Sequence, residues 1–265
     1  MNVLIIGRGL IGKYINDHIQ GSTIIESSKA STYLKQYDYD WVINCTFDPA
    51  LNNKDYFFDT SYDAKILQLI KSKTKYLMLS SRCVYPTASQ WNACEKDNIC
   101  IKNISSSYGR NKFTNELQIK KFIDEKKTIV LRLPNIFGKH QSANKIKQTF
   151  FSQMHRSLLE NGVIKFNFSK TTRRDFMYAG DLAKVIKLLI DEHVYGTYNC
   201  GYGYPVECIE LANILIESLG YGTIDDTNEI KDEFFLNTSK INKAITYPKM
   251  KYLKEGILES INNGV

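Results

Sequence analysis

No stretch of this sequence is apolar over the roughly 18 consecutive residues that a membrane span requires. The mean hydropathy is negative, and the first residues, MNVLIIGRGLIG, contain neither the basic leader nor the small-residue cleavage site of a secretory signal. These absences argue against a membrane or secreted protein. We therefore expect a cytoplasmic protein with no membrane partner.

Metal-binding and nucleic-acid-binding patterns are also missing. The six cysteines form no C-x-x-C pair, and none of the four histidines stands at metal-ligand spacing from them. We therefore predict reduced thiols and no metal site. The formal net charge of +7 comes from scattered lysines with only short clusters such as 71–75, without a zinc-finger or RNA-recognition signature. We interpret them as a solvated surface and expect no nucleic-acid partner.

The order of apolar and amphipathic segments predicts an α/β fold. Short runs rich in β-branched residues alternate with longer amphipathic stretches, which is typical of a parallel sheet covered on both faces by helices. The 265 residues, 43% of them hydrophobic, suffice for a full core. We predict strands at 3–6, 23–26, 41–45, 76–79 and 128–133, and helices at about 60–72, 106–125, 143–160, 180–192, 206–219 and 251–262.

A glycine-rich turn directly follows the first strand and opens a helix that extends to about Gln20. In that context a G-x-G-x-x-G match predicts a dinucleotide site. The first glycine permits the tight turn, the second lets the backbone approach a pyrophosphate, and the third lets helix and strand pack closely. The helix N-terminus presents N–H groups to the phosphates. We expect the cofactor NAD(P)H to bind along this turn, at Gly7, Arg8, Gly9, Leu10, Ile11 and Gly12.

The choice between NAD and NADP stays open at this point. Glu26 lies nineteen residues after Gly7, where an acidic side chain binds the adenine ribose 2′-hydroxyl of NAD. Arg8 and Lys29 favour the opposite choice, because cations there pair with the 2′-phosphate of NADP. Only fourteen residues, 27–40, separate the second strand from the third. That length accommodates one crossover helix, so we expect the sheet to lack one strand on the adenine side.

Tyr108 and Lys112 form a candidate catalytic pair at the start of a predicted helix. Their i, i+4 spacing puts the phenol and the ammonium on the same face. A nearby cation stabilises phenolate, so we expect Lys112 to lower the pKa of Tyr108 toward a range useful for proton transfer at neutral pH. An exposed helical pair is the alternative when the motif is taken alone.

Further motifs accompany this pair in a fixed order. They are SSRCVYP at 80–86, LRLPNIFG at 131–138, RRDFMYAGDLA at 173–183, GTYNCG at 196–201 and NTSK at 237–240. Together with the glycine turn they resemble the extended short-chain dehydrogenase/reductase family, the NAD(P)-dependent epimerases, dehydratases and reductases of nucleotide-activated sugars. The resemblance spans nearly the whole chain.

The resemblance implies roles for individual residues. Ser81 is the hydroxyl that hydrogen-bonds the substrate oxygen, Tyr108 is the acid/base, and Lys112 binds the nicotinamide ribose. Asn135 positions the substrate and Arg174 reaches the nucleotide diphosphate. Structural roles are implied for Ser80, Ser105, Ser106, Ser107, Arg132 and Asp181.

Two features depart from the family pattern. One is the shortened connection over 27–40, which removes the stretch where relatives place an acidic residue against adenine. The other is NCTFDP at 44–49 in place of the usual alanine-rich segment, so that Cys45 and Thr46 are expected to form the cofactor wall.

The resemblance also implies the domain organisation. We predict a dinucleotide-binding Rossmann domain over 1–138 with returning segments near 171–201, and a smaller α/β substrate-binding lobe from 139–170 and 202–265. The expected substrate is a nucleotide sugar, and the expected assembly is a homodimer.

Three functions remain in view, and reduction of a 4-keto(-6-deoxy) nucleotide sugar for surface polysaccharide precursors leads them. Dehydration is disfavoured, because the acidic pair that elimination requires is replaced here by Arg82 and Cys83. The first alternative is an epimerase, alone or bifunctional with the reductase, that uses Cys83 with Lys145 or, less favourably, His140. The second is a dinucleotide-binding sensor without turnover, which normally lacks the Tyr108 and Lys112 pair.

Overall fold

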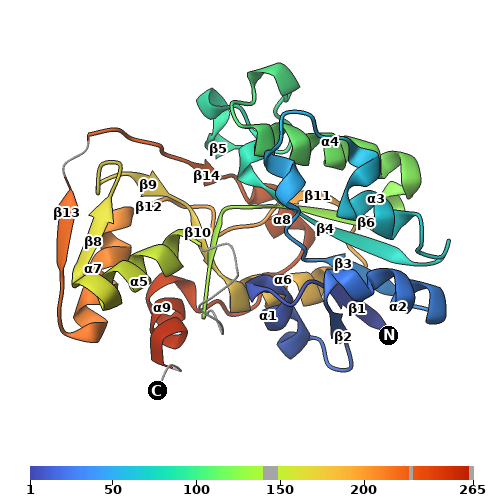
Figure 1. Ribbon diagram of the computed structural model, residues 1–265, viewed down its shortest axis with the longest axis horizontal. Helices are drawn as coiled ribbons and strands as arrows, with labels where there is room; N and C mark the ends of the chain where they lie inside the picture. The colour runs from blue at the N-terminus through green and yellow to red at the C-terminus, as the bar shows by residue number, and fades with distance from the viewer. Residues whose placement is uncertain (140–148, 227–228, 263–265) are drawn as a thin grey trace.

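The centre of the molecule is a parallel six-stranded sheet. The computed structural model describes residues 1–139, 149–226 and 229–262. The sheet has the order β11(Gly196–Asn199), β6(Thr128–Leu133), β4(Lys75–Ser81), β3(Trp41–Asn44), β1(Val3–Ile6) and β2(Thr23–Ile25) (Figure 1). Every neighbouring pair runs parallel. This is the Rossmann-type sheet that the sequence predicts.

Helices cover both faces of this sheet, because each strand alternates its side chains between them. In β1, Val3 and Ile5 pack into a core with α1(Leu10–His18) and α6(Ala179–Asp191). The intervening Leu4 and Ile6 face the opposite core. That second core includes side chains of α2(Ala30–Gln36), α3(Tyr62–Leu67) and α4(Ser107–Phe122). The buried strands are therefore apolar on both sides, which explains why they read as continuous apolar runs.

The expected missing strand is absent from the described residues. The short helix η1(Ser27–Lys29) follows β2 at once, and α2 then leads straight into β3. Strand β2 therefore forms the edge of the sheet. The shortened connection over 27–40 leaves no room for another strand, as its length predicts.

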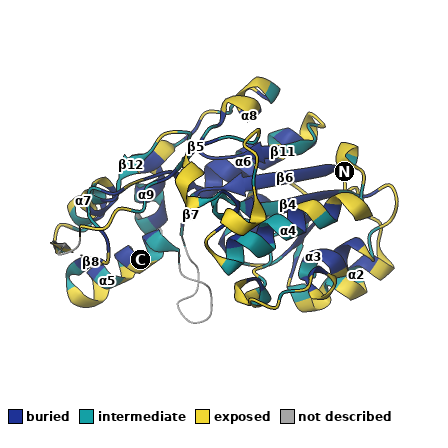
Figure 2. Cartoon of the chain, turned by 90° about the horizontal axis from the view of Figure 1, so that it is seen from above, coloured by how far each residue is buried: buried dark blue, intermediate teal, exposed yellow. Residues whose placement is uncertain are grey.

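A second set of elements forms a separate apolar core. Strands β8(Val163–Phe166) and β13(Thr223–Asp226) pair in parallel, and the helices around them are α5(Phe150–Asn161), α7(Cys208–Leu219) and α9(Tyr252–Asn262). Their shared core includes Phe151, Leu158, Leu215 and Ile257. Figure 2 shows these elements grouped at the end of the molecule away from the N-terminus.

Short strands join the two groups. They are β7(Asn135–Phe137) with β10(Phe176–Tyr178), β9(Arg173–Arg174) with β12(Val206–Glu207), and β5(Trp91–Ala93) with β14(Phe235–Leu236). The remaining helix is α8(Ser239–Ala244). Within the described parts of the chain, no helix has both the length and the apolar character needed to cross a bilayer.

Most long predicted elements are confirmed. Helices predicted at 106–125, 180–192, 206–219 and 251–262 lie within three residues of α4, α6, α7 and α9. The helix predicted at 60–72 was too long, since α3 ends at Leu67. Residues 143–148 of the helix predicted at 143–160 lie outside the described residues, and α5 begins at Phe150. Strand β11 and the strands outside the central sheet were not predicted, since most of them lack an apolar β-branched run like those of β1 and β3.

Asp175 lies between β9 and β10 where the two groups meet. Its carboxylate accepts the Leu236 N–H at 3.3 Å, and its backbone carbonyl accepts the Asn135 N–H at 3.2 Å. The residue is fully buried. Burial raises the pKa of Asp175 to about 7, against hydrogen bonds from the backbone that lower it. The carboxyl is therefore protonated in the folded chain at mildly acidic pH.

This raised pKa predicts a specific pH dependence of stability. Between pH 3.8, where the unfolded carboxyl titrates, and about pH 7, the folded chain holds a proton that the unfolded chain has lost. The free energy of unfolding therefore falls as the pH rises through this window. Asp175→Asn should flatten the decline, measured by urea unfolding at pH 5 and pH 8. Asp17→Asn on the exposed side of α1 is the control, and an unchanged slope in Asp175→Asn would contradict the prediction.

Candidate active site

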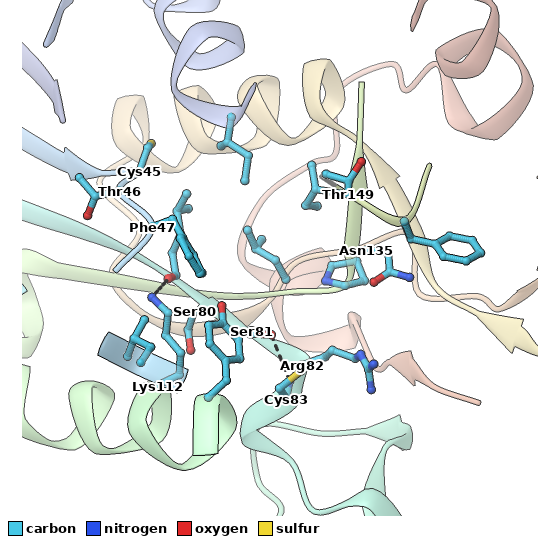
Figure 3. Close-up of a pocket in the computed structure, with 18 residues that line it drawn as sticks. Cys45, Thr46, Phe47, Ser80, Ser81, Arg82, Cys83, Lys112, Asn135 and Thr149 are labelled. Carbon is cyan, nitrogen blue, oxygen red and sulfur yellow. Dashed lines mark hydrogen bonds between the residues drawn. The ribbon is translucent and has the colours of Figure 1, made fainter. Parts of the chain in front are cut away.

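A cavity of about 400 Å³ opens at the carboxyl ends of β3, β4 and β6 (Figure 3). In open parallel sheets, ligands bind at this edge, outside the strand ends. The volume lies in the range of small-molecule sites, which is about 300–1,000 Å³. Eight of the residues predicted to take part in catalysis or in cofactor or substrate binding line this one cavity: Ile11, Cys45, Thr46, Ser81, Cys83, Tyr108, Lys112 and Asn135.

The glycine turn has the geometry that a pyrophosphate needs. Gly7 has a φ of +114°, and a Cβ there would lie 2.7 Å from the Cys45 carbonyl carbon. A Cβ on Gly12 would lie 2.0 Å from the Gly7 carbonyl oxygen. A Cβ on Gly9 would meet nothing within 4 Å. The first and third glycines are thus required by packing, whereas the second leaves open space in front of the α1 N-terminus. The turn fits the phosphates of a dinucleotide.

The predicted adenosine-side residues lie on the surface. Glu26 directly follows β2, and Glu26, Arg8 and Lys29 are all exposed. No ion pair joins Glu26 to either cation among the interactions of the described residues. The Leu10 side chain is buried in the hydrophobic core that α1 and α6 form with the sheet. It therefore supports the glycine turn from the core side.

The wall after β3 is held by a buried polar chain. Thr46 donates its hydroxyl to the Asn44 side-chain oxygen at 2.7 Å. Asn44 in turn donates to Asp63 at 2.7 Å, and Asn115 on α4 donates to the second oxygen of Asp63 at 2.8 Å. Burial raises the pKa of the neighbouring Cys45 thiol to about 12. Cys45 is therefore a neutral packing side chain at physiological pH.

Ser81, Tyr108 and Lys112 all line this cavity. Ser81 ends β4, and the other two lie on the first turns of α4. A side-chain hydrogen bond joins Ser81 and Tyr108. Lys112 is 8% exposed, and its ammonium donates to the Leu79 carbonyl at 2.9 Å, as the dashed line in Figure 3 shows. The three groups thus converge as the sequence predicts.

Gly109 permits this convergence, and the sequence reasoning did not identify it. A Cβ at this position would lie only 2.0 Å from the Cys83 carbonyl oxygen. The glycine therefore lets α4 press against the 3₁₀ turn η4(Arg82–Val84). Ser106 caps the helix by accepting the Gly109 N–H at 3.0 Å, which agrees with the structural role expected for it. The sequence does contain a signal for this close approach, because a glycine directly follows the predicted catalytic tyrosine.

The expected lowering of the Tyr108 pKa is wrong for this structure. Burial raises the pKa of Tyr108 above its usual value, the charge of Cys83 raises it further, and the hydrogen bond with Ser81 lowers it only in part. Lys112 is not among the causes of this shift, and its ammonium donates to the Leu79 carbonyl. Tyr108 is therefore a protonated phenol at neutral pH.

The predicted structural residues form buried networks around the site. Arg132 of β6 forms an ion pair with Glu116 of α4 at 2.7 Å, and Ser80 donates to the same carboxylate. Asp181 is fully buried and accepts a hydrogen bond from Tyr202 at 2.7 Å. These side chains hold strands and helices together, so the structural interpretation of Ser80, Arg132 and Asp181 is confirmed.

Asn135, predicted to position the substrate, lines another part of the cavity. Arg82, Thr149 and Phe150 also line the cavity, and the sequence did not predict them as site residues. Arg174 does not appear in this lining, because it turns to Asp232 and donates to its carboxylate at 3.0 Å. Cys83 lines the cavity. Lys145 and His140, named as the second acid/base of an epimerase, lie outside the described residues.

Comparison with known proteins identifies relatives of this architecture. A model of the NAD dependent epimerase/dehydratase family matches residues 4–201. A dTDP-4-dehydrorhamnose reductase from Clostridium acetobutylicum superposes with a TM-score of 0.80 at 17% identity over 99% of each chain. A UDP-N-acetylglucosamine 4-epimerase from Methanobrevibacter ruminantium M1, in complex with UDP-N-acetylmuramic acid, gives 0.77 at 20% identity, covering 98% of this chain and 97% of that one.

A third structure has a similar degree of likeness. The ADP-L-glycero-D-manno-heptose-6-epimerase of Helicobacter pylori superposes with a TM-score of 0.78 at 17% identity, over 99% of this chain and 95% of the epimerase. At identities this low, the three structures establish the fold, and the family match rests on the sequence of residues 4–201.

The open space at Gly9 yields a test that separates binding from folding. Gly9→Ala should leave the melting temperature within about one degree of wild type, because its Cβ meets no neighbour. The same methyl group fills the place of a phosphate, so dinucleotide affinity should fall about 10-fold or more. Gly12→Ala is the contrasting variant, since its clash with the Gly7 carbonyl should lower the melting temperature. Undiminished cofactor affinity in Gly9→Ala, by calorimetry with NADH and NADPH, would contradict this placement.

Proposed function

Because this chain belongs to the NAD-dependent epimerase/dehydratase family, we propose that it is an NAD(P)H-dependent reductase of a 4-keto(-6-deoxy) nucleotide sugar, serving surface polysaccharide precursors. One observation carries the proposal. Tyr108 is protonated and hydrogen-bonded to Ser81 in a cavity where a substrate carbonyl can lie beside both hydroxyls. A protonated phenol is the form that the reductive direction requires, because the carbonyl oxygen must receive a proton.

Each of the three central residues has a distinct task in this proposal. The phenol of Tyr108 donates its proton to the carbonyl oxygen, and the hydroxyl of Ser81 donates a hydrogen bond that stabilises the developing alkoxide. Lys112, held at the Leu79 carbonyl, has the task of binding the ribose hydroxyls of the cofactor in this proposal. When bound, the reduced nicotinamide cofactor supplies the hydride.

The cavity lining supports reduction over dehydration. Elimination requires an additional acid and base beside the sugar, yet no Asp, Glu or His occurs among the described residues that line the cavity. The acidic pair of dehydratases is replaced by Arg82 and Cys83. One of the structures with the same fold is titled a dTDP-4-dehydrorhamnose reductase, which is consistent with this reaction class.

The cofactor and the substrate lobe are part of the same proposal. An unpaired carboxylate at Glu26 supports NADH, because it can accept a ribose 2′-hydroxyl and repels a 2′-phosphate. Comparing initial rates with NADH and NADPH tests this choice. We assign substrate binding to the lobe formed by 139–170 and 202–265. The expected homodimer stays a prediction that sedimentation analysis of the purified chain can test.

Epimerisation is the second candidate, because Cys83 lines the same cavity as Tyr108. A thiol beside a keto group can exchange the proton on the adjacent carbon. Incubation of a 4-keto nucleotide sugar in D₂O without added cofactor separates the two candidates. Deuterium incorporated beside the keto group would support epimerisation. Its absence, together with cofactor oxidation in a parallel incubation with added NADH or NADPH, would support simple reduction.

Tyr108→Phe tests the reductase directly. Removal of the hydroxyl eliminates the proton donor but keeps the ring, so kcat should fall at least 10³-fold while cofactor affinity stays within about 2-fold. The assay follows NADH or NADPH absorbance with a panel of 4-keto nucleotide sugars. Thr114→Ala, further along α4, is the control. Retained turnover in Tyr108→Phe would refute the assignment, and no turnover by wild type on any panel member would favour a dinucleotide-binding sensor.

A further inference from the structure

Two motifs of the sequence are not used by the proposed reaction, GTYNCG at 196–201 and NTSK at 237–240. The first contains β11 and the second leads into α8, and these two elements pack against each other (Figure 1). Strand β11 is the last strand of the central sheet, next to β6. An edge strand presents backbone N–H and C=O groups that can pair with another chain. The outward-facing groups of β11 are therefore a possible interaction surface.

Two residues of β11 turn their backbone groups away from the sheet. The Cys200 N–H, directly after the strand, donates to the Arg132 carbonyl of β6 at 2.9 Å. Alternate residues of a paired strand point their backbone groups to opposite sides. Gly196 and the residue at 198 therefore face β6 as Cys200 does, and the intervening residues at 197 and 199 face outward.

Charged side chains from two distant segments occupy this outer edge. The Lys240 ammonium, from α8, donates to the Thr197 carbonyl at 2.7 Å, and it lies 4.7 Å from the centre of the Tyr198 ring. The Asn199 N–H donates to Oε1 of Glu95 at 2.7 Å, and Glu95 comes from the segment after β5. Hydrogen bonds to ionised groups are stronger than those between neutral groups. One acceptor and one donor of the edge are thus blocked by a cation and an anion.

A hollow of about 300 Å³ lies beside this edge, and both Glu95 and Lys240 line it. Apolar side chains also line it, namely Ile119 and Ile123 at the end of α4 and Val130 of β6. A strand added to β11 would point alternate side chains toward this side of the sheet. Apolar area would then be buried, which favours pairing. The edge is therefore attractive to a further strand once the two charged side chains are removed.

The opposite edge of the sheet is protected in a different way. Strand β2 has only three residues, and the carbonyl of Ile25 accepts the Gly7 N–H at 2.8 Å on the side of β1. By the same alternation, Ile24 is the residue of β2 that faces outward. Very short edge strands offer little to a partner chain. The longer edge strand, β11, is the one that carries the two blocking side chains.

We propose that the outer edge of β11 is a self-association surface that Glu95 and Lys240 keep closed. The partner that it fits is the same edge of a second copy of this chain, paired antiparallel about a twofold axis, because such a contact is self-complementary. A second strand would have to displace both charged side chains and replace two charge-assisted hydrogen bonds by ordinary amide bonds. That exchange is unfavourable, so the edge stays closed. This inference goes beyond the proposed function and does not depend on it.

Removal of both charges should open the edge. Glu95→Met and Lys240→Met keep the length of the side chain but remove its charge and its hydrogen bond. The double variant should therefore self-associate at least about 10-fold more tightly than wild type. Glu95→Gln and Lys240→Arg retain an acceptor and a donor, so they should behave like wild type. Lys243→Met on α8 and Glu217→Met on α7 are matched controls, because they put the same side chain at exposed positions outside the lining of the hollow.

The experiment is sedimentation velocity of the full chain and each variant over a wide range of protein concentration. Hydrogen exchange measured by mass spectrometry locates the contact, since pairing of two edges slows the exchange of backbone N–H groups in 196–199 as the concentration rises. Thermal unfolding shows whether each variant is folded. If the double variant melts below wild type, Lys240→Met alone provides the test, because Lys240 is exposed.

Association of the double variant beyond the wild-type assembly, with slower exchange at 196–199 and unchanged controls, would support the proposal. Equal sedimentation of the double variant and wild type would overturn it. Association that Lys243→Met and Glu217→Met produce as well would also overturn it, since exposed methionine would then be the cause. Protection of 196–199 that rises with concentration in wild type would overturn it too, because the edge would then already be paired.

Discussion

The buried ion pair between Glu116 and Arg132 is the interaction on which the site depends. It ties α4 to β6, and Ser80 joins the end of β4 to the same carboxylate. Three separate elements are thereby fixed at one point, one residue before Ser81. Removing a single partner of such a pair typically costs about 3–5 kcal/mol, because the other charge is left buried without compensation. The candidate catalytic groups are therefore positioned by a buried ion pair between α4 and β6.

The sequence predicted those features that leave a local signature. The parallel sheet, its missing strand and the convergence of Ser81, Tyr108 and Lys112 followed from apolar runs, a connection length and motif order. The closeness of Gly109 to the Cys83 carbonyl and the contact of Arg82 with Asp232 did not follow. Both contacts join segments that lie far apart in the sequence. The hydrophobic periodicity of a single segment contains no information about such contacts. Short strands such as β11 were not predicted for a related reason. They are strands because they pair with a neighbouring strand, here β6, and their own residues give little signal.

The wrong prediction for the pKa of Tyr108 shows that helical i, i+4 spacing alone does not determine the electrostatics of a side chain. Helical spacing puts Lys112 on the correct face, but a lysine side chain is long and follows the nearest unsatisfied acceptor, here the Leu79 carbonyl. The phenol is then governed by burial, which favours its neutral form. Burial therefore has the largest effect on the pKa of Tyr108, ahead of its charged and hydrogen-bonding neighbours.

The position of β2 at the edge of the sheet bears on how long a dinucleotide bound in the proposed way would stay. A further strand beyond β2 would enclose the adenosine half, whereas in the proposed placement exposed Glu26 and the short η1 turn border that half. Less enclosure means faster dissociation. An enzyme that regenerates its cofactor within each catalytic cycle benefits from holding it permanently, but one that consumes a reduced cofactor must exchange it every time. A sheet that ends at β2 therefore suits an enzyme that exchanges its cofactor in every catalytic cycle.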